Sequence, residues 1–245
     1  PIEREARGWQ LNLPGSRKSS LKDFNVAIWS NDELAPVSKD ISQRCEDVGN
    51  NLASIGANVS YTAKPEHDFL KAEINYQLLL QSVMQSGMSD DEFKKIEEIA
   101  SNLDRNDLSA DAILAKGTVL SHRNWIRQNY AREQIKISWS KFFQEWDILI
   151  CPQLATTAIE HDHRKMSERT IMIDNQEQRF FQQIFWPGLA VNAHLPSTVF
   201  PTGLASDGMP IGLQAIGAVY EDKTTIKFAE LYEEEFKAFV VPNLD

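Results

Sequence analysis

Residues 24–29 read FNVAIW and residues 58–63 read NVSYTA, two short runs that are rich in strand-forming residues. The apolar residues between them recur every three or four positions: Ile41, Cys45, Val48, Leu52 and Ile55. This spacing predicts an amphipathic helix over residues 38–55, which Gly56 ends. A strand, a helix and a second strand in this order form a β-α-β unit, whose strands are parallel when both join one sheet.

The middle of the chain is predicted to be helical. Periodic apolar positions indicate helices over residues 67–86 and over residues 108–146, the second with a break near Gly117. Ser89 followed by Glu92 is the pattern of a capping box, which predicts the start of a further helix.

The final part of the chain returns to strands. Residues 147–151 read DILIC and predict a buried strand that Pro152 ends. Residues 197–202 and 211–216 predict two more strands, and the Asp-Gly pair between them favours an antiparallel hairpin. The sheet should therefore be mixed, with parallel strands early in the chain and an antiparallel pair late.

The remaining elements complete an α/β fold in which a mixed β-sheet is flanked by helices. We expect a small hairpin over residues 169–180, a helix over residues 179–186 and a last helix over residues 222–239. The apolar face expected for this last helix comprises Ile226, Ala229, Tyr232, Phe236 and Phe239. We expect a single domain over residues 1–245, in which residues 1–23 form an irregular arm.

The composition of the chain argues against a nucleic-acid or a membrane partner. The chain has 245 residues, with 25 Lys and Arg, 35 Asp and Glu, and a formal net charge of -10. Because nucleic-acid binding depends mainly on clustered Lys and Arg, we expect no nucleic-acid partner. Two cysteines are too few for a disulfide framework, and no apolar run reaches membrane-spanning length. We expect a cytoplasmic protein without a membrane partner.

Familiar catalytic motifs are absent from the sequence. It contains no Gly-rich phosphate loop, no G-x-S-x-G, no H-E-x-x-H and no C-x-x-C. Residues 15–20 read GSRKSS and hold the residue types of a Ser-Ser-Lys system, but contiguous residues in a turn rarely hold a base against a nucleophile. We interpret them as a linker. Residues 160–163 read EHDH, and without a second group of ligands we interpret them as a polar loop and expect no metal.

Four blocks late in the chain carry a resemblance. Residues 147–152 read DILICP, residues 195–203 read LPSTVFPTG and residues 209–217 read MPIGLQAIG, and the predicted helix over residues 222–235 follows. In order and spacing these blocks resemble the amidase signature family, in which such strands carry the patterns LP…P-x-G and GLPVGLQ-x-x-G. Met209 stands where the family usually has Leu. The resemblance covers essentially the whole chain.

The resemblance implies the C-terminal portion of the amidase-signature fold and the hydrolysis of a carboxamide C–N bond by a Ser–cis-Ser–Lys triad. In the family, the triad and the Gly/Ser-rich loop that holds the oxyanion precede the region matched here. No residue of this chain therefore takes a catalytic role. We expect the chain alone to be inactive and to need the N-terminal half of the same enzyme as its partner. No cofactor is implied.

The same resemblance leaves this chain a share of the pocket for a small-molecule amide. We expect the wall residues to be Trp125, Gln153, Trp186 and His194. His122 and Trp125 are three positions apart on a predicted helix and can share a face. Pro187 and Gly188, next to Trp186, permit close approach of the backbone.

Several alternatives stay open. Within the same family, the chain could belong to the ammonia-releasing A subunit of a glutamyl-tRNA amidotransferase. Outside it, the chain could be a non-catalytic binding module, or a metal hydrolase that uses His161 and His163. A homodimer is also left open. A sheet cut through its middle has unpaired edges, so we expect the isolated chain to associate.

Overall fold

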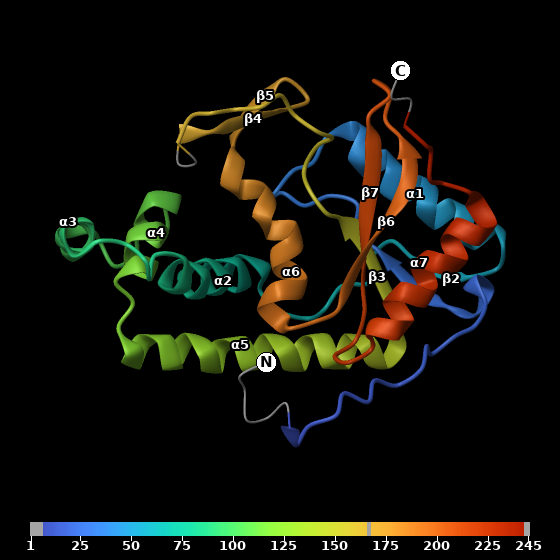
Figure 1. Ribbon diagram of the computed structural model, residues 1–245, viewed down its shortest axis with the longest axis horizontal. Helices are drawn as coiled ribbons and strands as arrows, with labels where there is room; N and C mark the ends of the chain where they lie inside the picture. The colour runs from blue at the N-terminus through green and yellow to red at the C-terminus, as the bar shows by residue number, and fades with distance from the viewer. Residues whose placement is uncertain (1–6, 166–167, 243–245) are drawn as a thin grey trace. The chain divides into compact units, whose positions relative to one another are not determined.

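The computed structural model describes residues 7–165 and 168–242 and divides into two compact units (Figure 1). Unit 1 comprises residues 1–64, 143–186 and 195–245, and unit 2 comprises residues 65–142 and 187–194. Each unit is described by itself below. The expected single domain over residues 1–245 stays a prediction, because compact units of this kind can belong to one folding domain.

Unit 1 contains a five-stranded mixed sheet with the strand order β2-β1-β3-β7-β6. Its strands are β1 (Asn25–Ile28), β2 (Asn58–Ser60), β3 (Ile148–Pro152), β6 (Ser197–Leu204) and β7 (Pro210–Ile216). β1 pairs in parallel with both β2 and β3, whereas β7 pairs antiparallel with β3 and with β6. The predicted α/β fold with a mixed sheet flanked by helices is therefore confirmed.

Two helices, α1 (Lys39–Ser54) and α7 (Asp222–Phe236), pack against this sheet. They lie on the same face, since the Asn51 amide of α1 donates to the Tyr232 hydroxyl of α7 at 3.5 Å. Four of the five predicted positions are buried in α1: Ile41, Cys45, Val48 and Leu52. The fifth, Ile55, follows the helix and is half-buried. Gly56 has a φ of +93°, which explains why the helix ends just before it.

The expected apolar face of α7 was partly wrong. Tyr232 is buried as predicted, but Ile226 and Phe239 are each 57% exposed. Phe228 is buried instead, and its ring packs edge-on against Phe200 at a centroid distance of 5.7 Å. The helix also ends at residue 236, three residues before the predicted end, because Lys237 adopts a left-handed conformation.

A second, two-stranded sheet in unit 1 is the predicted hairpin. It pairs β4 (Thr170–Ile173) antiparallel with β5 (Gln176–Arg179). Asp174 and Asn175 connect the strands with φ values of 46° and 67°. Two successive left-handed residues are typical of the two-residue turn that matches the twist of a hairpin.

Unit 2 is helical, as the sequence predicts. It contains α2 (Phe69–Met84), α3 (Asp90–Asn102), α4 (Ala110–Thr118) and most of α5 (His122–Glu145). The break near Gly117 separates α4 from α5, and the Ser89–Glu92 capping box opens α3. In the part of the chain that the structure describes, no helix is long and apolar enough to cross a membrane.

The helix expected over residues 179–186 is wrong at its end. A 3-10 helix, η4 (Phe180–Ile184), leads directly into α6 (Phe185–Ala193). Pro187 does not end the helix, because it lies in the first turn of α6, where its missing N–H is not needed. Within unit 2, a Cβ atom at Gly188 would lie 2.6 Å from the Tyr76 ring, so close packing requires glycine there.

Candidate functional site

The carboxyl ends of the parallel strands of unit 1 share one edge of the sheet. The connection after β1 leads to β2, on one side of β1, whereas the connection after β3 leads toward β6, at the far edge of the sheet. Ligand crevices form outside the carboxyl ends of strands where successive connections diverge in this way. The segments that follow β1 and β3 therefore build the candidate site.

The segment after β1 is held by its own hydrogen bonds. Trp29 N donates to Ile150 O at 2.9 Å, which extends the pairing of β1 with β3 by one residue. The Trp29 indole N–H donates to Asn31 O at 3.0 Å, and Asn31 Oδ1 accepts from Val37 N at 3.1 Å. Ser38 N then donates to Ala155 O at 2.8 Å, which ties this segment to the one that follows β3.

Gln214 of β7 joins the end of β3 to the start of α6. Its side chain is 1% exposed, and Nε2 donates to Pro152 O and to Trp186 O, each at 2.9 Å. Its Oε1 accepts from Ser197 Oγ at 2.9 Å. Gln214 is not among the site residues predicted from the sequence, although a lone amide in an otherwise apolar strand was a signal for a buried polar contact.

Trp186 lies beneath the segment that follows β1. It is 0% exposed, and its indole N–H donates to Ala35 O at 3.0 Å. Its ring packs edge-on against Trp29 at a centroid distance of 5.6 Å. The contacts of Trp186 hold the segment after β1 in place, and a direct role in a pocket wall stays a prediction.

Gln153 is the first residue after β3 and is half-buried. Among the described residues its side chain forms no hydrogen bond, so its amide has both donors and its acceptor available at the carboxyl edge. Of the four predicted wall residues, unit 1 contains Gln153 and Trp186, which Gln214 connects through the carbonyls of Pro152 and Trp186.

Lys64 is a cation at the same edge that the sequence interpretation missed. Its ammonium group lies 4.1 Å from the centroid of the Trp29 ring and 3.5 Å from Asp32 Oδ2. The ring face and the carboxylate both attract a positive charge, so they fix the position of this side chain. The only signal in the sequence was a lysine shortly after the second strand.

Cys151 is not an activated nucleophile. It is fully buried in β3, and burial raises the pKa of its thiol, so the thiol keeps its proton at neutral pH. The hydrogen bond from Gln214 opposes this shift and is the smaller effect. Cys151 is therefore an inert residue of the core.

Unit 2 contains the other two predicted wall residues, Trp125 and His194. Trp125 is half-buried and stacks on His122, with an interplanar angle of 4° and a centroid distance of 6.5 Å. His194 follows α6 with a φ of 56° and is exposed. Partial burial lowers the pKa of His194, and the positive charges of Lys136 and Arg132 lower it further. Their pocket roles stay predictions.

The histidine-rich loop does not assemble a metal site. His161 and His163 lie edge-on with a centroid distance of 6.4 Å, and both carboxylate oxygens of Asp162 accept hydrogen bonds from Arg164. Among the described residues, no group of three or more His, Cys, Asp and Glu is arranged to hold a metal ion. In the described part of the chain, His161 and His163 therefore have no third ligand beside them.

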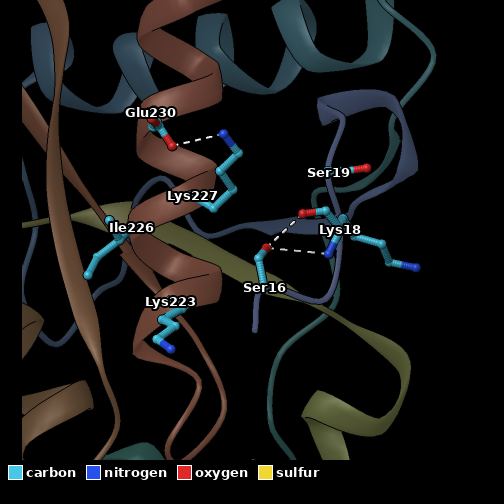
Figure 2. Close-up of a pocket in the computed structure, with 7 residues that line it drawn as sticks. All are labelled: Ser16, Lys18, Ser19, Lys223, Ile226, Lys227 and Glu230. Carbon is cyan, nitrogen blue, oxygen red and sulfur yellow. Dashed lines mark hydrogen bonds and ion pairs between the residues drawn. The ribbon is translucent and has the colours of Figure 1, made fainter. Parts of the chain in front are cut away.

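The Ser-Ser-Lys residue types of the arm do not form a catalytic dyad. Ser16 Oγ donates to Lys18 O at 2.7 Å and accepts from Lys18 N at 3.4 Å, which closes a local turn. Figure 2 shows the Lys18 ammonium pointing away from Ser16. The hydroxyl therefore has no base beside it, as expected for a linker.

Comparison with protein families gives a match over most of the chain. The family model described as Amidase matches residues 10–226. The A subunit of the glutamyl-tRNA(Gln) amidotransferase of Thermosynechococcus vestitus is 31% identical over 111 residues, which are 45% of this chain and 21% of that protein. The protein of the same name from Aliarcobacter butzleri is 34% identical over 101 residues, 41% of this chain and 20% of that protein.

Solved structures share the fold. A bacterial aryl acylamidase of the amidase signature family superposes with a TM-score of 0.60 at 16% identity, over 88% of this chain and 44% of that one. The A subunit of the glutamyl-tRNA(Gln) amidotransferase of Thermotoga maritima gives a TM-score of 0.62 at 15% identity, over 93% of this chain and 46% of that one. The chain thus spans less than half the length of these proteins.

Proposed function

Because this chain belongs to the amidase family, we propose that it supplies the C-terminal portion of an enzyme that hydrolyses a carboxamide C–N bond to an acid and ammonia or an amine. The match of residues 10–226 to the family model carries this proposal. The arrangement of the carboxyl edge supports it, since Gln214 and Trp186 rigidly position the segments from which a pocket wall can be built.

The substrate is a small-molecule amide, and this chain contributes wall residues rather than reacting groups. Gln153 presents its free amide at the carboxyl edge of unit 1, where it can hydrogen-bond the carbonyl or amine of an amide. Trp186 keeps the neighbouring segment in place. Trp125 and His194 of unit 2 are proposed as further wall residues.

The reacting groups come from the N-terminal half of the same enzyme. There, a serine hydroxyl adds to the amide carbonyl, the amine leaves with a proton, and water hydrolyses the resulting ester to the acid. The family resemblance puts the Ser–cis-Ser–Lys triad in a segment before the region matched here, so the chain alone is inactive.

The outer edge of β6 is where the N-terminal half would join the sheet. β6 pairs with β7 on one side, and among the described residues nothing pairs with its other side. This edge is eight residues long, and Val199 in its middle is 53% exposed. The opposite edge strand, β2, has three residues. The longer, half-apolar edge is the better template for another strand.

The test is amine or ammonia release by the 245-residue chain and by the same chain extended upstream through its reading frame, against a panel of linear amides. We expect release only from the extended protein. Turnover by the short chain would overturn the assignment of the triad to the N-terminal half. An extended protein that contains the triad and releases nothing from any amide would favour the non-catalytic binding module.

A second candidate is the A subunit of a glutamyl-tRNA amidotransferase, which uses the released ammonia in a partner. It is favoured by relatives of that name that are 31% and 34% identical to parts of this chain. Purification of the extended protein from its own cells distinguishes the two. Stoichiometric partner proteins and glutamine as the preferred amide would favour the amidotransferase, whereas a free protein acting on other amides would favour the stand-alone amidase.

A further inference from the structure

A groove of about 380 Å³ lies in unit 1 between the irregular arm and α7 (Figure 2). The arm contributes Ser16, Lys18 and Ser19, and α7 contributes Lys223, Lys227 and Glu230. Three of these six side chains are cationic and one is anionic. The lining therefore carries a net charge of two positive units, in a chain whose formal net charge is -10.

The arm is fixed against α7, so the groove is preformed. Arg17 N donates to Thr224 Oγ1 at 3.2 Å, and Arg17 Nε pairs with Glu221 Oε2 at 2.5 Å. Arg17 Nη1 also lies 3.5 Å from Asp147 Oδ1 and donates to Phe143 O at 2.9 Å. The positive charge of Arg17 is thus paired with the two carboxylates beside the groove, Glu221 and Asp147. These carboxylates therefore do not pair with the lysines that line the groove.

The lysines retain donors for a ligand. An ammonium group has three N–H donors. Lys223 Nζ uses one on Leu13 O at 3.3 Å, and Lys227 Nζ uses one on Glu230 Oε2 at 2.9 Å. Among the described residues, Lys18 Nζ has no partner. It points away from α7 in Figure 2 and can swing on its flexible four-carbon stem.

We propose that this groove binds a small molecule that carries a phosphate monoester. A phosphate monoester bears roughly two negative charges at neutral pH and three strong acceptor oxygens. These match the net charge of the lining and the remaining N–H donors of Lys223 and Lys227. Its size is within the range of small-molecule sites, roughly 300–1,000 Å³. Ile226, which is exposed on the α7 wall, offers an apolar surface to the organic part of the ligand.

The site is independent of amide hydrolysis, so its test measures binding to the 245-residue chain and needs no activity. Calorimetric titration at low salt compares phenyl phosphate with phenyl sulfate, which has the same shape and one charge fewer. We expect phenyl phosphate to bind more tightly, with an affinity that falls as salt is added. Equal affinity for the two ligands, or no binding of phenyl phosphate at about 10 mM, would overturn the proposal.

Variants test the residues. Lys223→Gln and Lys227→Gln should each weaken phenyl phosphate binding about fivefold, because each removes one charge next to the ligand. Glu230→Gln should strengthen it, since Lys227 then loses its competing partner. Lys22→Gln is the matched control, an exposed lysine on the same arm that does not line the groove. A loss in Lys22→Gln equal to the others, or weaker binding in Glu230→Gln, would contradict the site.

Discussion

The side-chain amide of Gln214 donates a hydrogen bond to the main-chain carbonyl of Trp186 at 2.9 Å. The same nitrogen donates to Pro152 O, so one buried residue of β7 connects the end of β3 to the first turn of α6. Both carbonyls lie where water cannot replace the bond. Gln214 therefore determines how the two segments of the candidate site meet.

Replacing Gln214 with Leu should lower the free energy of unfolding by about 3 kcal/mol, because it removes the side-chain hydrogen bonds to the buried carbonyls of Pro152 and Trp186 and to the Ser197 hydroxyl. Urea unfolding followed by circular dichroism measures the change. Gln153→Leu is the matched control and should change stability by less than about 0.5 kcal/mol, since this amide has no bond to lose. Equal losses in both variants would contradict the role of Gln214.

Trp186→Phe should loosen the segment after β1. The variant keeps most of the buried aromatic surface and removes only the indole N–H that bonds Ala35 O at 3.0 Å. We expect a loss of about 1–2 kcal/mol. We also expect faster hydrogen exchange at the Val37 and Ser38 amides than in the wild-type chain. Unchanged exchange at both amides would show that the indole bond does not hold this segment.

Arg17→Ala should release the arm from the rest of unit 1. The guanidinium contacts Glu221, Asp147 and the carbonyl of Phe143. Its side chain is 28% exposed, so solvent screening limits the loss to about 1–2 kcal/mol. Arg17→Lys should not restore the attachment of the arm, because a single ammonium cannot replace the several N–H donors of the planar guanidinium. Limited proteolysis near residue 17 reports the release, and the exposed Lys22→Ala should remain as resistant as wild type.

The stability of the chain should fall with acid through His67. Burial lowers the pKa of His67 to about 4, from a usual value near 6.5, and the nearby charge of Asp68 opposes the shift. Nδ1 of this ring lies 3.1 Å from Ser138 Oγ. Because the folded pKa is below the unfolded one, the contribution is complete above pH 6.5 and is lost as the pH falls toward 4.

Urea unfolding at pH 7 and at pH 5 measures this dependence. His67→Asn should flatten the difference between the two pH values, whereas His122→Asn, at an exposed histidine of the same unit, should keep it. A His67→Asn chain with the full wild-type pH dependence would assign the effect to other groups.

The isolated chain should associate through the outer edge of β6, and Val199→Lys should reduce that association. A lysine in the middle of an edge strand opposes pairing with another chain. Light scattering after size-exclusion chromatography should show a shift toward monomer. Val191→Lys, at a valine of α6 that is 57% exposed, is the control and should leave the association unchanged. A wild-type chain that is already monomeric would refute the expectation.

Local pattern was sufficient for most of the elements. Residues close to one another in the chain were enough to predict four features. These are the helical period of α1, the capping box of α3, the turn between β4 and β5, and the strands of the main sheet. Elements that depend on distant partners were less predictable. The sequence predicted Ile226 as a core residue of α7. In the structure Ile226 is exposed, and Phe228 is buried against the ring of Phe200 in β6.

In the candidate site, too, the features set by local sequence were predictable and those set by distant partners were not. The sequence placed Gln153 and Trp186 near the end of a strand and beside a sheet edge, because strand ends and Pro-Gly pairs are local signals. It could not reveal that Trp186 is fully buried, that Lys64 lies over Trp29, or that Gln214 bonds two carbonyls. The pocket roles of Trp125 and His194 stay predictions.

The sequence by itself determined the family and the mixed sheet. Only the tertiary structure decided which polar groups hold the carboxyl edge together and which lysines line a groove with the arm. The physical reason is range. Helix and strand periods arise from neighbours within a few residues, whereas a bond such as Arg17 to Glu221 joins positions far apart in the chain, which only the completed fold brings together.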